Sequence, residues 1–221
     1  MPNVELYGSP NSTFVRTTRL ACEEKGVPYD MMQVGENTFS DLKKPEHLKR
    51  HPFGKIPAMQ HGDNTVFESI AICRYIDEAF DGPALQPADA LERARMTQWT
   101  SAINDNLVPT MLRGYIAAIF APPGLDIETD EDKLNAFRET IHQHCRILDE
   151  ALAGRTYLAG DRISIADLLL TPILHYLGNT LDGLSFFEGR DNIGRWWHAV
   201  SKRPSFKNTV PPFLAKETEA A

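Results

Sequence analysis

Two adjacent hydroxyl side chains, Ser12 and Thr13, stand in the segment GSPNSTFVR, where a strand-like run ends and a helix is expected to begin. Ser and Thr are preferred at the first position of a helix, because the side-chain oxygen accepts a hydrogen bond from a free backbone N–H. No cysteine is present in this turn. The segment leaves two interpretations open: a plain helix cap, or a hydroxyl that contacts something reactive.

A basic segment lies between residues 43 and 55, in a chain whose formal charge is -7. It contains Lys43, Lys44, Lys49, Arg50 and Lys55, together with His47 and His51. Such a segment in an acidic protein is typical either of an anion-binding wall or of a solvated helix face. The net negative charge argues against nucleic acid as a partner.

The other side chains that could take part in catalysis or metal binding are better explained by structural roles. Ser164 and Asp167 have the spacing of a capping box, so Asp167 is predicted to hold a helix end. His142 and His144 are two residues apart, and on a helix such residues do not face one another. His47 and His51 share a helix face, but no third ligand is visible. No metal site is therefore predicted.

The elements that must position these residues fall into two parts. Residues 1–80 alternate in the order β-α-β-α-β-β-α, with strands at 4–7 and 29–34, helices at 12–26, 41–50 and 68–80, and a hairpin in KIPAMQHGDNTVFES. A strand, a crossover helix and a second strand should be parallel and right-handed, and the hairpin adds antiparallel strands. We expect a small mixed sheet.

Residues 81–89 form the predicted linker. In residues 90–221 the apolar residues recur with the period of a helix. Met96 to Ile119 marks one long helix, and Thr129 with Asp132 has the spacing of a capping box for the next helix. A helix over 165–177 is apolar nearly all round, so it should be buried, with a kink at Pro172. A last short helix should stop before Pro204.

Composition places limits on the class of protein. The chain has 221 residues, of which 42% are apolar and 24% charged, enough material for a large core. No apolar run reaches the ~18 residues that a membrane span needs, and no signal peptide is visible. The cysteines Cys22, Cys73 and Cys145 are far apart and odd in number, which favours a reducing cytosol. We expect a cytoplasmic protein.

Five segments taken together resemble the glutathione S-transferase family: PNSTFVR, HPFGKIPAMQHGD, FESIAICRYI, ISIADLLLTPILHYLG and WWHAVSKRPSF. They cover nearly the whole chain in order, and they look most like the phi class of plants and its microbial relatives. The resemblance implies a thioredoxin-like N-terminal domain, an all-helical C-terminal domain and a homodimer.

By this resemblance, Ser12 aligns with the hydroxyl that activates glutathione. A free thiol has a pKa of ~8.5, and a hydroxyl that donates a hydrogen bond to the sulfur, beside a helix N-terminus, favours the thiolate. Thr13 is the second candidate, because Ser12 keeps the family's spacing to Arg16. The missing cysteine disfavours the thiol-reductase branch of the family.

The resemblance also implies a binding site for the peptide part of glutathione. A cis bond at Ile56-Pro57 would turn the Ile56 backbone outward to pair with the cysteinyl backbone. Glu68 would accept from the γ-glutamyl ammonium, and Ser69 would donate to its carboxylate at a helix start. The alternatives are an ordinary proline at a strand start and a plain capping pair.

Lys43, Lys44 and Lys55 are the candidates for binding the glycyl carboxylate. Here the sequence departs from the phi pattern, which often has a histidine where Leu42 stands, and Gln and Asn where Lys55 and His51 stand. Lys55 still donates and adds positive charge, so we expect binding to survive.

A hydrophobic electrophile would lie against Met111, Tyr115 and Ile119 on the long helix. Side chains at helical spacing are more often core than pocket, so this set is the weaker part of the interpretation.

The sequence therefore predicts a glutathione transferase that needs no cofactor beyond glutathione as co-substrate, with neither nucleic acid nor membrane as a partner. Two alternatives remain open on the same residues: a glutathione-dependent peroxidase, and a homologue that binds ligands without catalysis.

Overall fold

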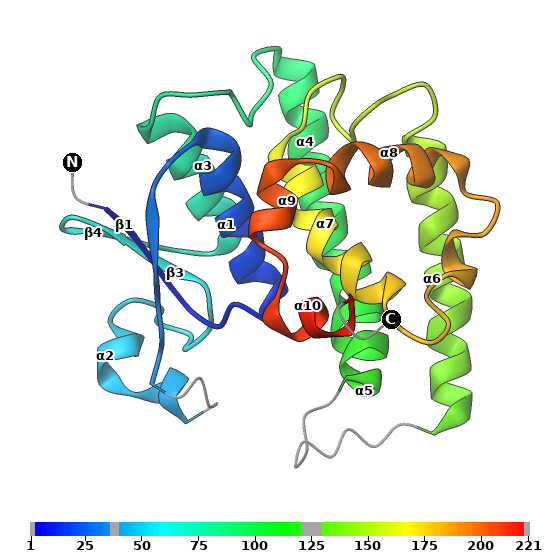
Figure 1. The fold of residues 1–221 in the computed structure, drawn as a ribbon, viewed down its shortest axis with the longest axis horizontal. Coiled ribbons are helices and arrows are strands. Elements are labelled where there is room, and N and C mark those ends of the chain that lie inside the picture. Colours follow the sequence, from blue (N-terminus) through cyan, green and yellow to red (C-terminus); the bar gives the residue numbers. More distant parts are fainter. Residues whose placement is uncertain (1–2, 36–39, 121–129, 219–221) are drawn as a thin grey trace. The chain divides into compact units, whose positions relative to one another are not determined.

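The computed structural model describes residues 3–35, 40–120 and 130–218. Within it the chain forms two compact units (Figure 1). Unit 1 contains the chain up to Pro87 together with the segment from Lys202 onward, and unit 2 runs from Ala88 to Ser201. The expected helical domain of 90–221 therefore differs from unit 2, because its last part groups with unit 1. In the described part of the chain, no helix is long and apolar enough to cross a membrane.

A four-stranded sheet with the strand order β2-β1-β3-β4 forms the centre of unit 1. The strands are β1 Val4–Tyr7, β2 Tyr29–Met32, β3 Ala58–His61 and β4 Asn64–Phe67. β1 and β2 are parallel and are joined through helix α1 (Thr13–Lys25), whereas the other neighbouring strands are antiparallel. The predicted mixed sheet is confirmed.

Two further helical segments belong to the first part of unit 1. Helix α3 (Ser69–Ala79) packs against α1. The predicted helix over 41–50 is interrupted: a short 3-10 turn η1 (Asp41–Lys43) is followed by helix α2 (Pro45–Leu48). Lys44 separates them with an extended ψ of 145°, because a residue that precedes proline is disfavoured in the helical region.

The C-terminal segment joins unit 1 through a buried arginine. It contains helices α9 (Pro204–Asn208) and α10 (Pro212–Thr218). Arg16 of α1 is fully buried and donates to the Phe206 carbonyl and to the Thr209 hydroxyl, both at 3.3 Å. Arg203 forms an ion pair with Glu24 of α1 at 2.5 Å. A buried guanidinium needs hydrogen-bond acceptors. The C-terminal segment supplies these acceptors to Arg16 and therefore packs against α1.

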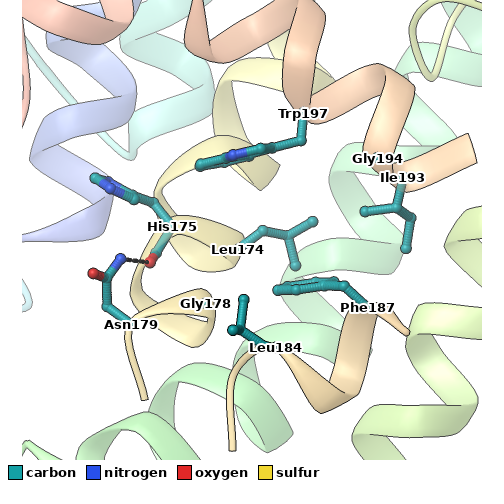
Figure 2. Close-up of a pocket in the computed structure, with 9 residues that line it drawn as sticks. All are labelled: Leu174, His175, Gly178, Asn179, Leu184, Phe187, Ile193, Gly194 and Trp197. Carbon is teal, nitrogen blue, oxygen red and sulfur yellow. Dashed lines mark hydrogen bonds between the residues drawn. The ribbon is translucent and has the colours of Figure 1, made fainter. Parts of the chain in front are cut away.

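Unit 2 is helical throughout its described regular elements (Figure 1). They are α4 Ala90–Ala102, η2 Ile103–Ile116, α5 Ala117–Ile119, α6 Glu131–Ala151, α7 Ile165–Gly178, η3 Ser185–Phe187 and α8 Asp191–Ser201. The helices α6 and α7 pack on η2, and α8 packs on α6. A surface pocket lies between the end of α7, η3 and α8 (Figure 2).

The predicted long helix is present as the continuous run of α4, η2 and α5, but its middle part has π-helical turns. Pro109 lies inside this part and has no N–H to donate, so a wider turn fits it better than a regular one. Gly114 allows α6 to approach, since a side chain there would come within 2.7 Å of the Phe137 ring.

The helix starts follow the capping predictions in part. Ser164 and Asp167 form the predicted capping box at the start of α7, which continues through Pro172 to Gly178. Helix α6 is capped by Asp130, which accepts from the Lys133 N–H at 2.7 Å. The box expected for Thr129 and Asp132 cannot be compared, because Thr129 lies outside the described residues.

Asp167 holds three segments of unit 2 together. Its carboxylate is fully buried and accepts from the backbone N–H of Leu158 at 2.9 Å, from the N–H and hydroxyl of Ser164 at 2.9 and 2.8 Å, and from the Trp196 indole at 2.9 Å. Burial raises the pKa of this carboxyl, and the four donors act in the opposite direction. The structural role predicted for Asp167 is thus visible in its contacts.

Replacing Asp167 with Asn should destabilise the protein by about 2–4 kcal/mol. Each carboxylate oxygen faces two donors, so the amide NH₂ of Asn would meet donors in either orientation. Urea unfolding followed by tryptophan fluorescence measures the change. The control Asp161→Asn, at an exposed carboxylate, should stay within about 0.5 kcal/mol. Equal stability of both variants would contradict the interpretation.

Candidate functional site

The strand register brings three separate stretches to one end of the sheet in unit 1. Tyr7, the last residue of β1, pairs with Ala58 of β3, and Ala58 pairs with Phe67 of β4. Pro57 therefore lies one residue before this row of three paired residues, whereas Gly8 and Glu68 each lie one residue after it. We call Ser12, Ile56, Pro57, Glu68 and Ser69, which lie in these stretches, the strand-end cluster.

Gly8 lets these stretches approach closely. Its φ of 150° is one that residues with a side chain rarely adopt, and a Cβ placed there would lie 2.6 Å from Val15 and 3.0 Å from Ile56. The first turn of α1 and the Ile56 side chain therefore both press against the backbone of Gly8. The sequence places this glycine in a turn, but a local pattern does not show which distant residue comes near it.

Ser12 is the N-cap of α1. Its backbone is extended, with φ -74° and ψ 128°, and its Oγ accepts a hydrogen bond from the Val15 N–H at 3.4 Å. Accepting uses a lone pair and leaves the hydroxyl proton available for a second partner. Ser12 is half-buried, whereas Thr13 is only 7% exposed. Ser12 can therefore cap α1 and contact a ligand at the same time.

The peptide bond between Ile56 and Pro57 is cis, as the resemblance implied. Within the described residues, neither the N–H nor the C=O of Ile56 makes a hydrogen bond. His47 supports the preceding residue, because its Nε2 lies 2.8 Å from the Lys55 carbonyl, and since a carbonyl only accepts, Nε2 carries the proton. His47 is therefore a positioning residue, a role that neither the basic segment nor its spacing to His51 indicates in the sequence.

Glu68 is the only non-glycine residue with a positive φ among those described, at 70°. Such a conformation costs of order 1–3 kcal/mol and is concentrated at ligand sites and active sites. Glu68 immediately precedes α3, and its side chain is exposed, whereas Ser69 is the first residue of the helix and is buried. This backbone conformation places the Glu68 carboxylate beside the N-terminus of α3.

The three predicted lysines differ in what they contact. Lys43 donates to the Phe53 carbonyl at 3.0 Å, and Lys44 pairs with Asp41 at 2.6 Å. The exposed Lys55 makes no hydrogen bond or ion pair through its side chain with the residues that the structure describes. The Lys55 ammonium is therefore available to an external anion, whereas Lys43 and Lys44 also bind to residues of their own loop.

Tyr7 offers another hydroxyl at the end of β1. Its OH donates to Glu5 at 2.6 Å, and the guanidinium of Arg50 lies 4.1 Å from the centre of its ring. Burial, followed by the hydrogen bond to Glu5, raises the pKa of Tyr7. This hydroxyl already serves an internal acceptor, so Ser12 remains the better candidate for contact with a ligand.

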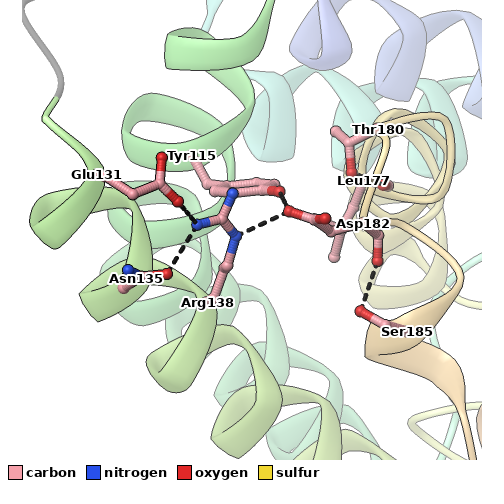
Figure 3. A network of polar contacts seen from close by, with 8 residues as sticks. All are labelled: Tyr115, Glu131, Asn135, Arg138, Leu177, Thr180, Asp182 and Ser185. Atoms are coloured by element: carbon pink, nitrogen blue, oxygen red, sulfur yellow. Dashed lines mark hydrogen bonds and ion pairs between the residues drawn. The ribbon is translucent and has the colours of Figure 1, made fainter.

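The residues predicted to form an apolar wall lie in unit 2. Met111 and Tyr115 have no exposed surface, whereas Ile119 is 36% exposed. The Tyr115 hydroxyl donates to Asp182 at 2.5 Å, and Arg138 donates to the same oxygen at 2.8 Å (Figure 3). Burial and then Asp182 raise the pKa of Tyr115. Ile119 is thus the member of this set that a ligand could touch without rearrangement of the interior.

Within the described ranges, no group of three or more His, Cys, Asp or Glu side chains is arranged to hold a metal ion. All three cysteines are buried and unpaired. Burial raises the pKa of Cys22 and of Cys145 to about 12 in each case. These thiols are therefore poor nucleophiles.

The chain is similar to known proteins over most of its length. Residues 2–78 match the model of the glutathione S-transferase N-terminal domain, and residues 105–204 match that of the C-terminal domain. Glutathione S-transferase 4 of Zea mays is 33% identical over 214 residues, covering 96% of this chain and 94% of the relative.

Solved structures show the same likeness. The crystal structure of glutathione transferase F2 from Populus trichocarpa is 33% identical, with a TM-score of 0.83, and the match covers 93% of this chain and 96% of that one. Glutathione S-transferase I from maize, in complex with an atrazine glutathione conjugate, is 28% identical with a TM-score of 0.83, covering 94% and 96% of the two chains.

His51, beside the strand-end cluster, should make stability sensitive to acid. It is 2% exposed, and burial lowers its pKa, with the charge of Glu68 acting in the opposite direction. The unfolded chain then binds the proton more readily, so stability is lost as pH falls through the unfolded pKa of ~6.5. The melting temperature of His51→Gln should fall less than that of the wild type between pH ~7.5 and ~5.5.

The control for this measurement is His198→Gln, at an exposed histidine. Its melting temperature should follow the wild-type dependence on pH. An unchanged slope in His51→Gln would show that burial of His51 does not contribute to acid sensitivity.

Proposed function

The chain belongs to the glutathione S-transferase family and is a phi-like transferase that uses glutathione, and from this we propose that the strand-end cluster is its glutathione site, with Ser12 as the catalytic residue. The observation that carries the proposal is the convergence of Ser12, Ile56 and Glu68 at one end of the sheet, through the register and through Gly8.

Ser12 acts as a hydrogen-bond donor to the glutathione sulfur. Its lone pair already accepts from the Val15 N–H, so its own proton is directed to the ligand. The free N–H groups at the start of α1 add partial positive charge. Both effects stabilise the thiolate relative to the thiol and lower the thiol pKa. Ser12 itself forms no covalent bond.

The peptide part of glutathione is held by backbone and side-chain groups of the strand-end cluster and by the neighbouring lysines. The N–H and C=O of Ile56 pair with the cysteinyl backbone in the manner of an added strand. Glu68 accepts from the γ-glutamyl ammonium, and Ser69 at the start of α3 donates to the neighbouring carboxylate. Lys55 attracts the glycyl carboxylate, with Lys43 and Lys44 adding positive charge.

The reaction is a nucleophilic substitution or addition. The thiol proton passes to solvent, and the thiolate attacks an electrophilic carbon to form a carbon–sulfur bond. In a substitution the leaving group departs with its electron pair. In an addition the π-electron pair moves to the neighbouring atom of the electrophile, which takes a proton from solvent. We assign a hydrophobic electrophile as the second substrate, with Ile119 as the accessible member of the set Met111, Tyr115 and Ile119. We further propose a cytosolic homodimer; the 63% exposed Phe53 offers one apolar contact for such an association.

Ser12→Ala should lower kcat/KM for conjugation of an aryl halide by about 10- to 100-fold, the value of a hydrogen bond to a charged group. Glutathione binding, measured by calorimetry, should persist because the peptide contacts remain. The pH dependence of kcat/KM should move to higher pH, because the thiol pKa is no longer lowered.

Thr13→Ala is the matched control and should keep near wild-type turnover. If Ser12→Ala turns over as the wild type does while Thr13→Ala loses activity, the catalytic role belongs to Thr13. If neither variant loses activity, activation by a hydroxyl in this turn is wrong.

Glu68→Gly tests the assignment of the γ-glutamyl contact separately. Glycine accepts a φ of 70° without strain, so the free energy of unfolding should stay within about 1 kcal/mol of the wild type. KM for glutathione should nevertheless rise by about tenfold, because a charged acceptor is lost. Unchanged KM would mean that the strained residue binds nothing.

A further inference from the structure

Two histidines lie close together at the end of α2. His47 belongs to this helix, and the His51 N–H donates to the His47 carbonyl at 2.9 Å, so the helical turn continues as far as His51. The centres of the two rings are 6.4 Å apart, and the ring planes are inclined by 29°. His47 has no exposed surface, and His51 is 2% exposed. The pair is therefore part of the interior of unit 1 and not of a solvated helix face.

The His51 ring packs against the end of β4. It lies on Phe67, the last residue of this strand, with the ring centres 4.9 Å apart and the planes inclined by 44°. The Phe53 ring lies edge-on to both, with its centre 6.3 Å from each of the other two. Aromatic rings at such distances and inclinations attract one another. Because Glu68 directly follows Phe67, a displacement of these rings would also move the residue with the positive φ.

A neutral His51 fits these surroundings, whereas a charged one does not. An imidazolium carries an N–H on both ring nitrogens, but the Nδ1 atoms of His51 and His47 are buried and have no hydrogen-bond partner among the described residues. A buried charge without an acceptor is costly. Burial lowers the pKa of His51; the charge of Glu68 acts in the opposite direction, and His47 and Lys55 lower the pKa further.

We infer that His51 is a positioning residue of the proposed glutathione site, which holds Phe67 and Glu68 in place while its ring is neutral and releases them in acid. The inference rests on the proposed function of the strand-end cluster, because it concerns the group assigned to the γ-glutamyl ammonium. Protonation acts on that group in two ways: the charged ring leaves its contact with Phe67, and it attracts the Glu68 carboxylate away from the ligand. His51 acts through these two residues and is not a catalytic residue.

The direction of the effect follows from proton linkage. Packed against Phe67, His51 has a pKa below the ~6.5 of a free histidine, and a ring displaced into water regains that value. The displaced conformation therefore binds the proton more readily, and its population increases as pH falls below ~6.5. Glutathione binds the packed conformation, so its apparent affinity falls with the packed fraction. One pH unit below ~6.5, this coupling amounts to at most about tenfold.

The experiment is isothermal titration of S-methylglutathione into the full-length protein at pH ~7.0 and ~5.5. This ligand has no free thiol, so ionisation of sulfur does not contribute. The wild-type Kd should rise about three- to tenfold between the two pH values. His51→Phe keeps a ring on Phe67 but cannot be protonated, so its Kd should stay within about twofold of the wild type at neutral pH and should lose most of the rise in acid.

Two further variants control this comparison. The exposed His198→Gln should show the wild-type rise. His51→Gln, which cannot carry a charge either, replaces His51→Phe where the larger ring prevents folding. Far-UV circular dichroism at both pH values checks that each protein is folded. An equal rise of Kd in the wild type and in the uncharged His51 variants would overturn the inference.

His51→Ala tests the positioning role at neutral pH. KM for glutathione should rise about fivefold, the value of one aromatic pair. The kcat for an aryl halide should stay within about twofold of the wild type, because the turn that carries Ser12 keeps its contacts. A wild-type KM in His51→Ala, beside a raised KM in Glu68→Gly, would overturn the inference alone. A wild-type KM in both variants would overturn the proposed γ-glutamyl contact as well.

Discussion

The close approach of three segments at Gly8 is the constraint on which the site depends. Only a residue without a side chain allows Val15 and Ile56 to press against the same backbone position. This contact sets the start of α1 beside the cis Ile56-Pro57 step. The sheet register then places Glu68 and the start of α3 at the same end. The proposed glutathione site is thus built from strand ends and helix starts, which supply unpaired backbone groups and partial positive charge.

One side chain can serve both folding and catalysis at this place. The oxygen of Ser12 caps α1 through a lone pair, and the same hydroxyl retains a proton that can be donated to a sulfur atom. The positive φ of Glu68 is a different case, because backbone strain of this kind is concentrated at ligand sites and active sites. The contribution of a residue to the free energy of unfolding would reveal neither the free proton of Ser12 nor the reason for the positive φ of Glu68.

Unit 2 depends on polar contacts between its own helices. Asp167 ties the start of α7 to Leu158 and Trp196, and Asp182 joins Tyr115 of η2 to Arg138 of α6. Donation by Tyr115 and Arg138 lowers the pKa of Asp182. These contacts hold segments of unit 2 together.

The sequence by itself determined the order of strands and helices and the caps at Ser12 and Ser164, and through resemblance it indicated candidate residues for a glutathione site. These are local: they depend on hydrogen bonds and periodicity within a few residues. The tertiary structure decided which glycine permits a close approach, that His47 supports Lys55, and that Met111 and Tyr115 are interior. It also decided that the chain from Lys202 belongs with unit 1, because Arg16 and Glu24 find their partners there. Such contacts join residues far apart in the chain, and no local pattern specifies the distance between them.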